Sequence, residues 1–202
     1  MSRRVAGILL AAGRSSRMGG PNKLLLRLKS GTLVGHTADE LLKASLSEVV
    51  AVTGHDSQNV DDELRSRELK RVFNPHFAVG MHSSIRQGIL ALEKEHDAFM
   101  ICLADQPDFD AKVLDLMVEG FRRSAGDAIV FPTYRGAQGH PVLIPAVYRE
   151  DILAHEDGDF GCAYLFKKYP EKLVGIPVES DRVVVDIDEP QDYLRHGGLH
   201  AT

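Results

Sequence analysis

The amino-acid sequence predicts an α/β fold, a single-domain three-layer α/β/α architecture with a mostly parallel twisted sheet. Short apolar runs of strand length alternate along the chain with longer segments whose apolar residues recur at helical spacing. Strands that alternate with helices form a sheet that is covered by helices on both faces. At 202 residues the chain is long enough to bury one core. We therefore expect one domain over residues 1–202, with a frayed tail at 196–202.

The first expected strand, residues 5–10, is an unbroken apolar run that leads into a glycine-rich loop. Residues 11–23 contain three glycines, two serines and three cationic residues, and no acidic residue. Glycine adopts backbone conformations that leave N–H groups exposed, and these groups together with Arg17 and Lys23 suit several negative oxygens at once. A nucleoside triphosphate presents such oxygens, so residues 1–25 are the candidate nucleotide-binding strand and loop. The alternative is a surface loop with solvated cations.

The distribution of charge supports an anion site in this loop. The chain has 24 Lys and Arg residues against 29 Asp and Glu residues, yet seven cationic residues precede the first acidic residue, Asp39. A basic segment in an acidic protein concentrates anions. The loop is not a Walker A loop, because two residues separate Gly20 from Lys23 and Leu24 follows the lysine. It also lacks the G-x-G-x-x-G pattern of dinucleotide-binding proteins.

The later elements follow from hydrophobic periodicity and from the positions of Gly, Pro and capping residues. Strands are expected at 48–55, 69–73, 97–107, 128–132, 174–178 and 183–185, with a hairpin at 134–144. Helices are expected from 32 or 35 to 45, at 57–67, 80–92, 110–121, 147–155 and 158–169, and from 190 onward.

Acidic residues stand at the ends of two expected strands. Asp105 ends the apolar run of the 97–107 segment, and the period-two spacing of a strand places Asp186 and Asp188 on one side. Ligands of parallel α/β sheets gather at the carboxyl ends of the strands, and Mg²⁺ takes one or two carboxylates together with phosphate oxygens. These three residues are candidate magnesium ligands. An Asp after a strand is also common as a turn or cap residue.

Two further polar positions are candidates for ligand contact. Ser83 and Ser84 open the expected 80–92 helix, where N–H groups and the helix dipole favour anions or hydroxyl-rich ligands. The alternative is that both serines only cap the helix. His140 lies in the hairpin turn without an identifiable carboxylate partner, so we expect a turn or substrate contact rather than a catalytic base.

Residues 10–23 resemble the L-A-A-G-x-S-x-R-M-G-x-x-K signature of the MobA-like nucleotidyltransferases, and most resemble the molybdenum cofactor cytidylyltransferases. The resemblance implies the Rossmann-like fold of nucleotide-diphospho-sugar transferases. Later segments continue the resemblance in the family's order. They are N-P at 74–75, G-M-x-S-S-I at 80–85, L-A-D-Q-P at 103–107, G-H-P-V at 139–142, G-D-x-G at 158–161 and D-I-D-x-P-x-D-Y at 186–193.

The resemblance implies Mg²⁺-dependent transfer of CMP from CTP to the phosphate of molybdopterin, giving molybdopterin cytosine dinucleotide and pyrophosphate. It implies that Arg17, Lys23 and Asp105 are catalytic, and that Asp105, Asp186 and Asp188 hold the metal. A recipient molybdenum hydroxylase is the implied protein partner. The nucleotide-binding residues that it implies are Leu10, Ala11, Ala12, Gly13, Arg17, Lys23, Asn74, Ser83, Ser84 and Asp105.

Alternatives stay open for the base and for the acceptor. Relatives that transfer GMP typically read L-A-G-G where residues 10–13 read L-A-A-G, which favours cytosine. The family often continues G-D-x-G with A-R, whereas Cys162 follows Gly161 here and no arginine is near. This departure leaves room for a transferase of the same fold that uses another phosphorylated acceptor. It also leaves room for a non-catalytic molybdenum cofactor chaperone.

Composition excludes several other classes of protein. The isoelectric point near 6.0 and the lack of a basic stripe argue against nucleic-acid binding. No apolar run approaches the roughly twenty residues that span a bilayer, and the 5–10 run is needed as a strand rather than as part of a signal peptide. Cys102 and Cys162 form no metal-like or redox pair, so we expect a reducing, cytoplasmic location.

Overall fold

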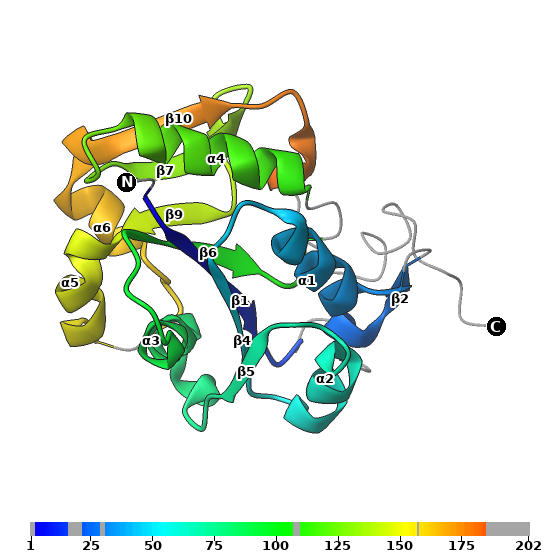
Figure 1. The fold of residues 1–202 in the computed structure, drawn as a ribbon. Coiled ribbons are helices and arrows are strands. Elements are labelled where there is room, and N and C mark those ends of the chain that lie inside the picture. Colours follow the sequence, from blue (N-terminus) through cyan, green and yellow to red (C-terminus); the bar gives the residue numbers. More distant parts are fainter. Residues whose placement is uncertain (1–2, 16–21, 29–30, 107–109, 157, 185–202) are drawn as a thin grey trace.

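A mixed, mostly parallel sheet forms the centre of the protein (Figure 1). The computed structural model describes residues 3–15, 22–28, 31–106, 110–156 and 158–184. Within these residues the strand order is β10-β7-β9-β6-β1-β4-β5, with β8 paired to β7. The strands are β1 Val5–Ala11, β4 Glu48–Thr53, β5 Lys70–Phe73, β6 Ala98–Leu103, β7 Ile129–Tyr134, β8 Ala137–Gln138, β9 Val142–Pro145 and β10 Leu173–Pro177. The short strands β2 Arg27–Leu28 and β3 Gly31–Thr32 pair with each other.

The pairing of the strands confirms the predicted α/β class. Strand β1 pairs in parallel with β4 on one side and with β6 on the other, and β4 pairs in parallel with β5. Strand β9 is antiparallel to both of its neighbours, β6 and β7. The expected hairpin is present as β7 and β8, where Tyr134 pairs with Ala137.

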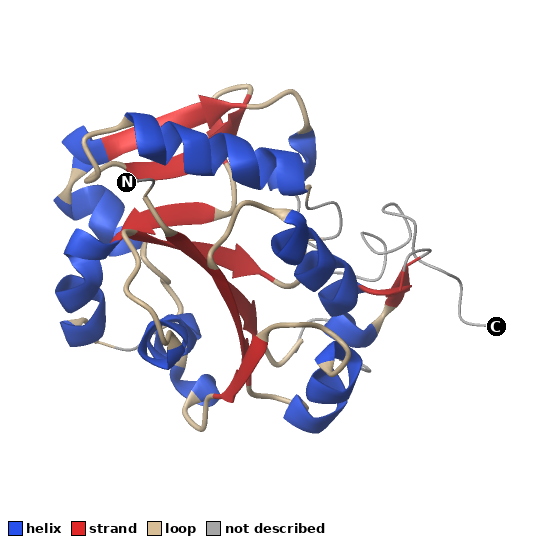
Figure 2. Cartoon of the chain, in the orientation of Figure 1, coloured by secondary structure: helices blue, strands red, loops and turns tan. Residues whose placement is uncertain are grey.

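Helices cover both faces of the sheet and give three layers (Figures 1 and 2). Helices α1, α2 and α4 pack on one face, and α3, α5 and α6 pack on the other. The helices are α1 Leu33–Lys43, α2 Ser57–Leu64, α3 Met81–Ala91, α4 Ala111–Arg123, α5 Arg149–Ala154 and α6 Ala163–Lys168. No helix in these described ranges is long and apolar enough to cross a membrane.

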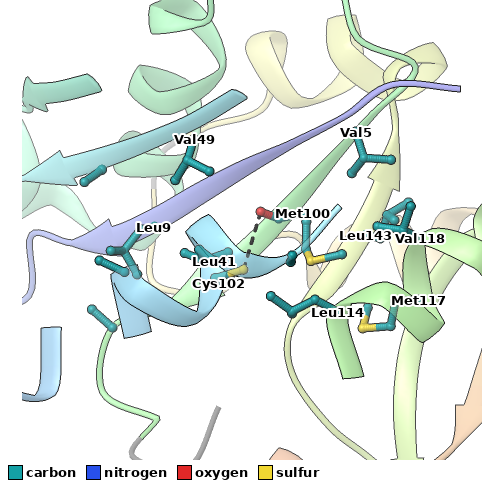
Figure 3. Close-up of a cluster of buried hydrophobic side chains, with 14 of the residues drawn as sticks. Val5, Leu9, Leu41, Val49, Met100, Cys102, Leu114, Met117, Val118 and Leu143 are labelled. Carbon is teal, nitrogen blue, oxygen red and sulfur yellow. Dashed lines mark hydrogen bonds between the residues drawn. The ribbon is translucent and has the colours of Figure 1, made fainter. Parts of the chain in front are cut away.

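The central strand β1 supplies side chains to two separate cores, because successive residues of a strand point to opposite faces. Leu9 packs toward α1 and α4, whereas Ile8 and Leu10 pack toward α3. Every residue of β1 is buried, as the unbroken apolar run predicts. Figure 3 shows part of the first core, in which Val5, Leu9, Leu41, Val49, Met100, Cys102, Leu114, Met117, Val118 and Leu143 are labelled.

Cys102 is a small buried thiol of this core, as expected from its apolar run. Its Sγ atom lies 3.7 Å from the carbonyl oxygen of Met100 (Figure 3). Burial raises the pKa of the Cys102 thiol well above its ordinary value, so the group stays protonated and unreactive.

Two sequence predictions about the later part of the chain are wrong. The helix expected from residue 158 begins at Ala163, because Gly161 takes a left-handed conformation (φ +54°) that a right-handed helix excludes. The strand expected at 183–185 is instead the 3₁₀ turn Asp181–Val184, as far as it is described. The Val183 carbonyl accepts a hydrogen bond from the backbone N–H of His140 at 2.8 Å, which holds the turn against the hairpin. Residue 185, the helix expected from 190 and the 196–202 tail lie outside the described residues.

The contact between α3 and the sheet generates a prediction about stability. A Cβ atom added at Gly88 would lie 2.4 Å from the Cγ2 atom of the fully buried Ile8. Gly88→Ala is expected to lower the free energy of unfolding, because overpacking costs about 1–3 kcal/mol and the better helix propensity of alanine returns only about 1 kcal/mol. Urea unfolding followed by circular dichroism measures this difference.

The control for this measurement is Gly13→Ala, since a Cβ atom added at Gly13 meets no atom of the described part of the chain within 4 Å. Equal stability of the two variants would contradict the close packing of α3 on β1.

Candidate active site

The three strands at the centre of the sheet end together, which fixes the start of the loop after β1. The backbone N–H of Ala104, just after β6, donates to the carbonyl oxygen of Leu10 at 3.2 Å. The backbone N–H of His55, just after β4, donates to the carbonyl oxygen of Ala12 at 3.2 Å. These bonds place residues 12–15 at the carboxyl edge of the parallel strands, where ligands of such sheets bind.

Side-chain hydrogen bonds join Ser15 to the segment that begins at Asn22. Ser15 has a left-handed backbone (φ +51°), and its hydroxyl donates to the Asn22 Oδ1 atom at 3.2 Å. The same hydroxyl accepts a bond from the Lys23 backbone N–H at 3.2 Å. Asn22 also caps the 3₁₀ turn Lys23–Leu25 by accepting from the Leu24 N–H. This local network orients the Lys23 side chain.

The sequence-predicted residues Lys23 and Asp105 form an ion pair. The Lys23 Nζ atom lies 2.7 Å from the Asp105 Oδ2 atom, and the side chains are 12% and 24% exposed. Asp105 stands directly after β6, so the pair joins the tip of this strand to the loop after β1. A partly desolvated pair of this kind interacts more strongly than an exposed one.

A cavity of about 370 Å³ opens beside this ion pair; we call it the first cavity. Six of the residues predicted from the sequence line it: Leu10, Ala12, Gly13, Lys23, Ser84 and Asp105. The predicted residues Arg17, Asp186 and Asp188 lie outside the described part of the chain. Within the described part, no cluster of three or more His, Cys, Asp or Glu residues is placed to hold a metal ion. The metal assignment therefore depends on Asp105 together with residues that are not described.

Three other predicted residues lie behind the cavity wall. Ala11 is fully buried in the sheet. The Asn74 Nδ2 atom donates to the hydroxyl oxygens of Ser83 and Ser84, at 2.8 and 3.0 Å. The Ser83 hydroxyl also contacts the carbonyl oxygen of Gly80 at 2.8 Å, as a cap does. Asn74 and Ser83 thus hold Ser84, which does line the first cavity.

Sequence reasoning missed several residues of the first cavity. Arg14 lies with its guanidinium carbon 5.6 Å from the centre of the Phe77 ring, a cation–π contact across the cavity wall. Asp159 comes from the segment before α6, and its Oδ1 atom accepts a bond from the Met81 N–H at 3.3 Å. The G-D-x-G segment at 158–161 is the signal that could have identified Asp159.

A second cavity, of about 230 Å³, adjoins the first one. Met81, Leu103 and Asp159 line both cavities. The rest of the second cavity is mostly apolar, with Gln138 and His140 as its other polar side chains. The apolar lining consists of Ile85, Ile101, Val142, Ile144, Phe160, Gly161, Cys162, Ala163 and Phe166.

Cys162 stands at the position where the family often has an alanine before its arginine. Burial raises the pKa of its thiol to about 12, so the group is neutral near pH 7. The Cys162 side chain therefore brings no charge to the second cavity.

Cavities at the carboxyl edge of parallel strands are where sheets of this kind bind their ligands, and the ion pair of Lys23 and Asp105 lies at that edge. The chain belongs to the family described as the MobA-like NTP transferase domain, which matches residues 7–173. This match confirms the family predicted from the sequence motifs.

Individual relatives within this family differ in the activity that their names give. The chain is 26% identical over 195 residues to the nicotine blue oxidoreductase of Paenarthrobacter nicotinovorans, which covers 95% of each chain. It is 24% identical over 197 residues to the molybdenum cofactor cytidylyltransferase of Escherichia coli K12, which covers 93% of this chain and 92% of the relative.

Solved structures confirm the predicted nucleotidyltransferase fold. A nucleotidyl transferase from Methanothermobacter superposes on this chain with a TM-score of 0.84 and 25% identity, over 96% of each chain. The family and the fold are thus established, and the substrates are not fixed by similarity.

The surroundings of Gly13 generate a prediction about ligand binding. Among the described residues, packing does not require glycine at this position, because an added Cβ atom meets none of their atoms within 4 Å. A ligand lying against the backbone would meet that atom. Gly13→Ala is expected to weaken the binding of a nucleoside triphosphate at least about tenfold, by about 1.4 kcal/mol, and to leave the free energy of unfolding within about 0.5 kcal/mol of the wild type.

Isothermal titration calorimetry with CTP and with GTP measures the change in affinity, and urea unfolding measures the stability. Wild-type affinity in this variant would show that the backbone of Gly13 does not contact the nucleotide.

Proposed function

We propose that this protein is a cytidylyltransferase that transfers CMP from CTP to the phosphate of molybdopterin. The observation that carries the proposal is the ion pair between Lys23 and Asp105 at the wall of the first cavity. In the proposed reaction an acceptor phosphate oxygen attacks the α-phosphorus of CTP, the bond to the bridging oxygen breaks, and pyrophosphate leaves. Such a transfer depends on positioning and on charge neutralisation by the protein.

The residues around the first cavity suit these two tasks. Backbone groups of residues 12–15 face the triphosphate, Ser84 offers a hydroxyl, and Lys23 pairs with phosphate oxygens. Arg17 is proposed to share this role with Lys23. Both cations lower the energy of the negative charge that develops on pyrophosphate.

Asp105 fits the expected magnesium ion in its chemistry. Its carboxylate is partly exposed at the first cavity, and Mg²⁺ prefers carboxylate and phosphate oxygens. Asp186 and Asp188 are proposed as further ligands. Magnesium, when bound, supplies charge that stabilises the phosphate oxygens. The Lys23 ammonium lies 2.7 Å from the Asp105 Oδ2 atom and holds this carboxylate at the cavity wall.

The second cavity is the proposed acceptor site. It shares three lining residues with the first cavity, so ligands in the two cavities would meet at their common wall. Its apolar side chains suit the faces of a flat ring system, and Gln138 and His140 offer hydrogen bonds to the ring edge.

The neutral Cys162 keeps the two alternatives for the acceptor open as proposals. A transferase that uses another phosphorylated acceptor would retain the first cavity and differ in the second. A cofactor chaperone would bind molybdopterin without releasing pyrophosphate. The similarity to nicotine blue oxidoreductase favours one further candidate, an oxidoreductase that uses the second cavity for an aromatic substrate. Neither redox turnover nor chaperone binding releases pyrophosphate from CTP, so one assay separates both from the proposed transfer.

We also propose a cytoplasmic location and delivery of the product to a molybdenum hydroxylase. The free state of Cys102 and Cys162 supports a reducing compartment. Delivery to a hydroxylase is proposed because a molybdopterin cytosine dinucleotide product would need an enzyme that uses it.

The first prediction from this proposal concerns the nucleotide. With Mg²⁺ and molybdopterin, the protein is expected to release pyrophosphate from CTP at least about tenfold faster than from GTP or ATP, a difference of about 1.4 kcal/mol. A coupled pyrophosphate assay run in parallel with the three nucleotides measures this. Preference for GTP would retain the mechanism and contradict the choice of cytosine. If a folded sample releases no pyrophosphate from any of the three nucleotides, the proposed transfer is contradicted.

The second prediction concerns Asp105. Asp105→Asn is expected to lower kcat/KM for CTP by about 2–4 kcal/mol of transition-state stabilisation, because the amide cannot supply the charge of the carboxylate. The matched control is Asp62→Asn, which removes an exposed ion pair between Asp62 of α2 and Arg65; neither residue lines the first or the second cavity. The pyrophosphate assay and a thermal melt are run on both variants. Full activity of Asp105→Asn would contradict the metal assignment.

A further inference from the structure

His82 is a fully buried side chain that contacts two backbone carbonyl groups. The Nδ1 atom lies 2.9 Å from the carbonyl oxygen of Gly161, and the Nε2 atom lies 2.9 Å from the carbonyl oxygen of Ile152. A carbonyl oxygen only accepts hydrogen bonds, so each contact requires a proton on the facing ring nitrogen. Neutral imidazole carries one such proton and imidazolium carries two. The neutral ring therefore donates to one of the two carbonyl groups, and the nitrogen that carries the proton decides which one.

We propose that His82 is the positioning residue that fixes residues 158–161 between the two cavities. The inference rests on the proposed function in one respect, namely that the cavities bind nucleotide and acceptor. His82 bonds to this segment at both of its ends. Its backbone N–H donates to the carbonyl oxygen of Gly158 at 3.0 Å, and its ring contacts the carbonyl oxygen of Gly161.

The 158–161 segment has a direct effect on both cavities. Asp159 lines the first and the second cavity, and Phe160 and Gly161 line the second. His82 itself is the second residue of α3, the helix that brings Ser84 to the first cavity. One buried ring thus links the helix of the first cavity to the wall of the second.

Close backbone packing leaves little room for the segment to move while the ring holds it. Gly80 has φ +127°, and a Cβ atom added there would lie 2.3 Å from the carbonyl carbon of Gly158. The Met81 N–H contacts the Asp159 carboxylate at 3.3 Å. Loss of the bond from His82 to Gly161 would leave the segment held at the Gly158 end and free to shift at the other.

The protonation of the ring is tested directly on the full-length protein. Uniform ¹⁵N labelling of its nine histidines and comparison with the His82→Asn spectrum assign the His82 ring signals. We expect the ring Nδ1 atom to carry a proton that donates to the Gly161 carbonyl oxygen. His155→Phe is the control, because it keeps a ring stacked on Tyr164 and removes the signals of the neighbouring histidine. An Nδ1 atom without a proton, with amides 158–161 still protected from deuterium exchange, would overturn the proposal.

Two matched variants test which contact holds the segment. The side-chain amide of Asn places its NH₂ group near the position of Nδ1, and that of Gln places it near Nε2. His82→Asn keeps a donor toward Gly161, and His82→Gln keeps a donor toward Ile152. We expect amides 158–161 to exchange at least about tenfold faster in His82→Gln than in His82→Asn. Equal exchange in the two variants, at equal global stability, would overturn the proposal.

These measurements need no substrate, so their outcome is separate from that of the proposed function. In turnover, His82→Gln is expected to raise KM for the acceptor at least about fivefold more than KM for CTP, and His82→Asn is expected to rescue this defect. Equal increases of both KM values in the two variants would indicate a merely structural residue and overturn the proposal. Absence of pyrophosphate release in the wild type, with the expected exchange difference between the two variants, would support the inference and contradict only the proposed function.

Discussion

The hydrogen bonds between the ends of the central strands are the constraint on which the site depends. The carbonyl groups of Leu10 and Ala12 accept from backbone N–H groups just beyond β6 and β4, and Thr53 does the same for Asn74 just beyond β5. Buried peptide groups need such partners, so the strand ends cannot separate without leaving polar groups unpaired. The loop after β1, the aspartate after β6 and the asparagine after β5 are therefore held in one place by the sheet itself.

The ion pair between Lys23 and Asp105 follows from this placement. Both residues are partly buried, and removal of either would break a partly desolvated ion pair. A triphosphate with a divalent cation offers each side chain a new partner of the right sign, the phosphate oxygens for Lys23 and the cation for Asp105. The pair thus holds both side chains at the cavity wall, where charged ligands can exchange with it.

Periodicity in the sequence predicted what depends on local burial, namely the central strands, the helices on both faces and the glycine-containing loop. The failures come from tertiary contacts. The valines near residue 183 favour a strand by propensity, yet the hairpin holds Val183 in a turn through the His140 N–H. The sequence alone does not reveal the left-handed backbone of Gly161, and this backbone makes α6 begin after residue 161 rather than at 158. Asp159 reaches the first cavity only because α3 packs against its segment, a contact between residues 78 positions apart.

The two adjoining cavities are built from different parts of the chain. The first cavity is built by the sheet ends and carries the residues that the family signature predicts. The second cavity is lined mostly by residues that come later in the chain. There this protein departs from the family pattern, which often continues G-D-x-G with Ala-Arg, because neutral Cys162 and then Ala163 follow Gly161. In this chain the backbone of the same segment contacts α3 through His82, whose ring lies 2.9 Å from the Gly161 carbonyl oxygen and whose N–H donates to the Gly158 carbonyl oxygen. The wall of the second cavity is therefore held by contacts of a buried histidine.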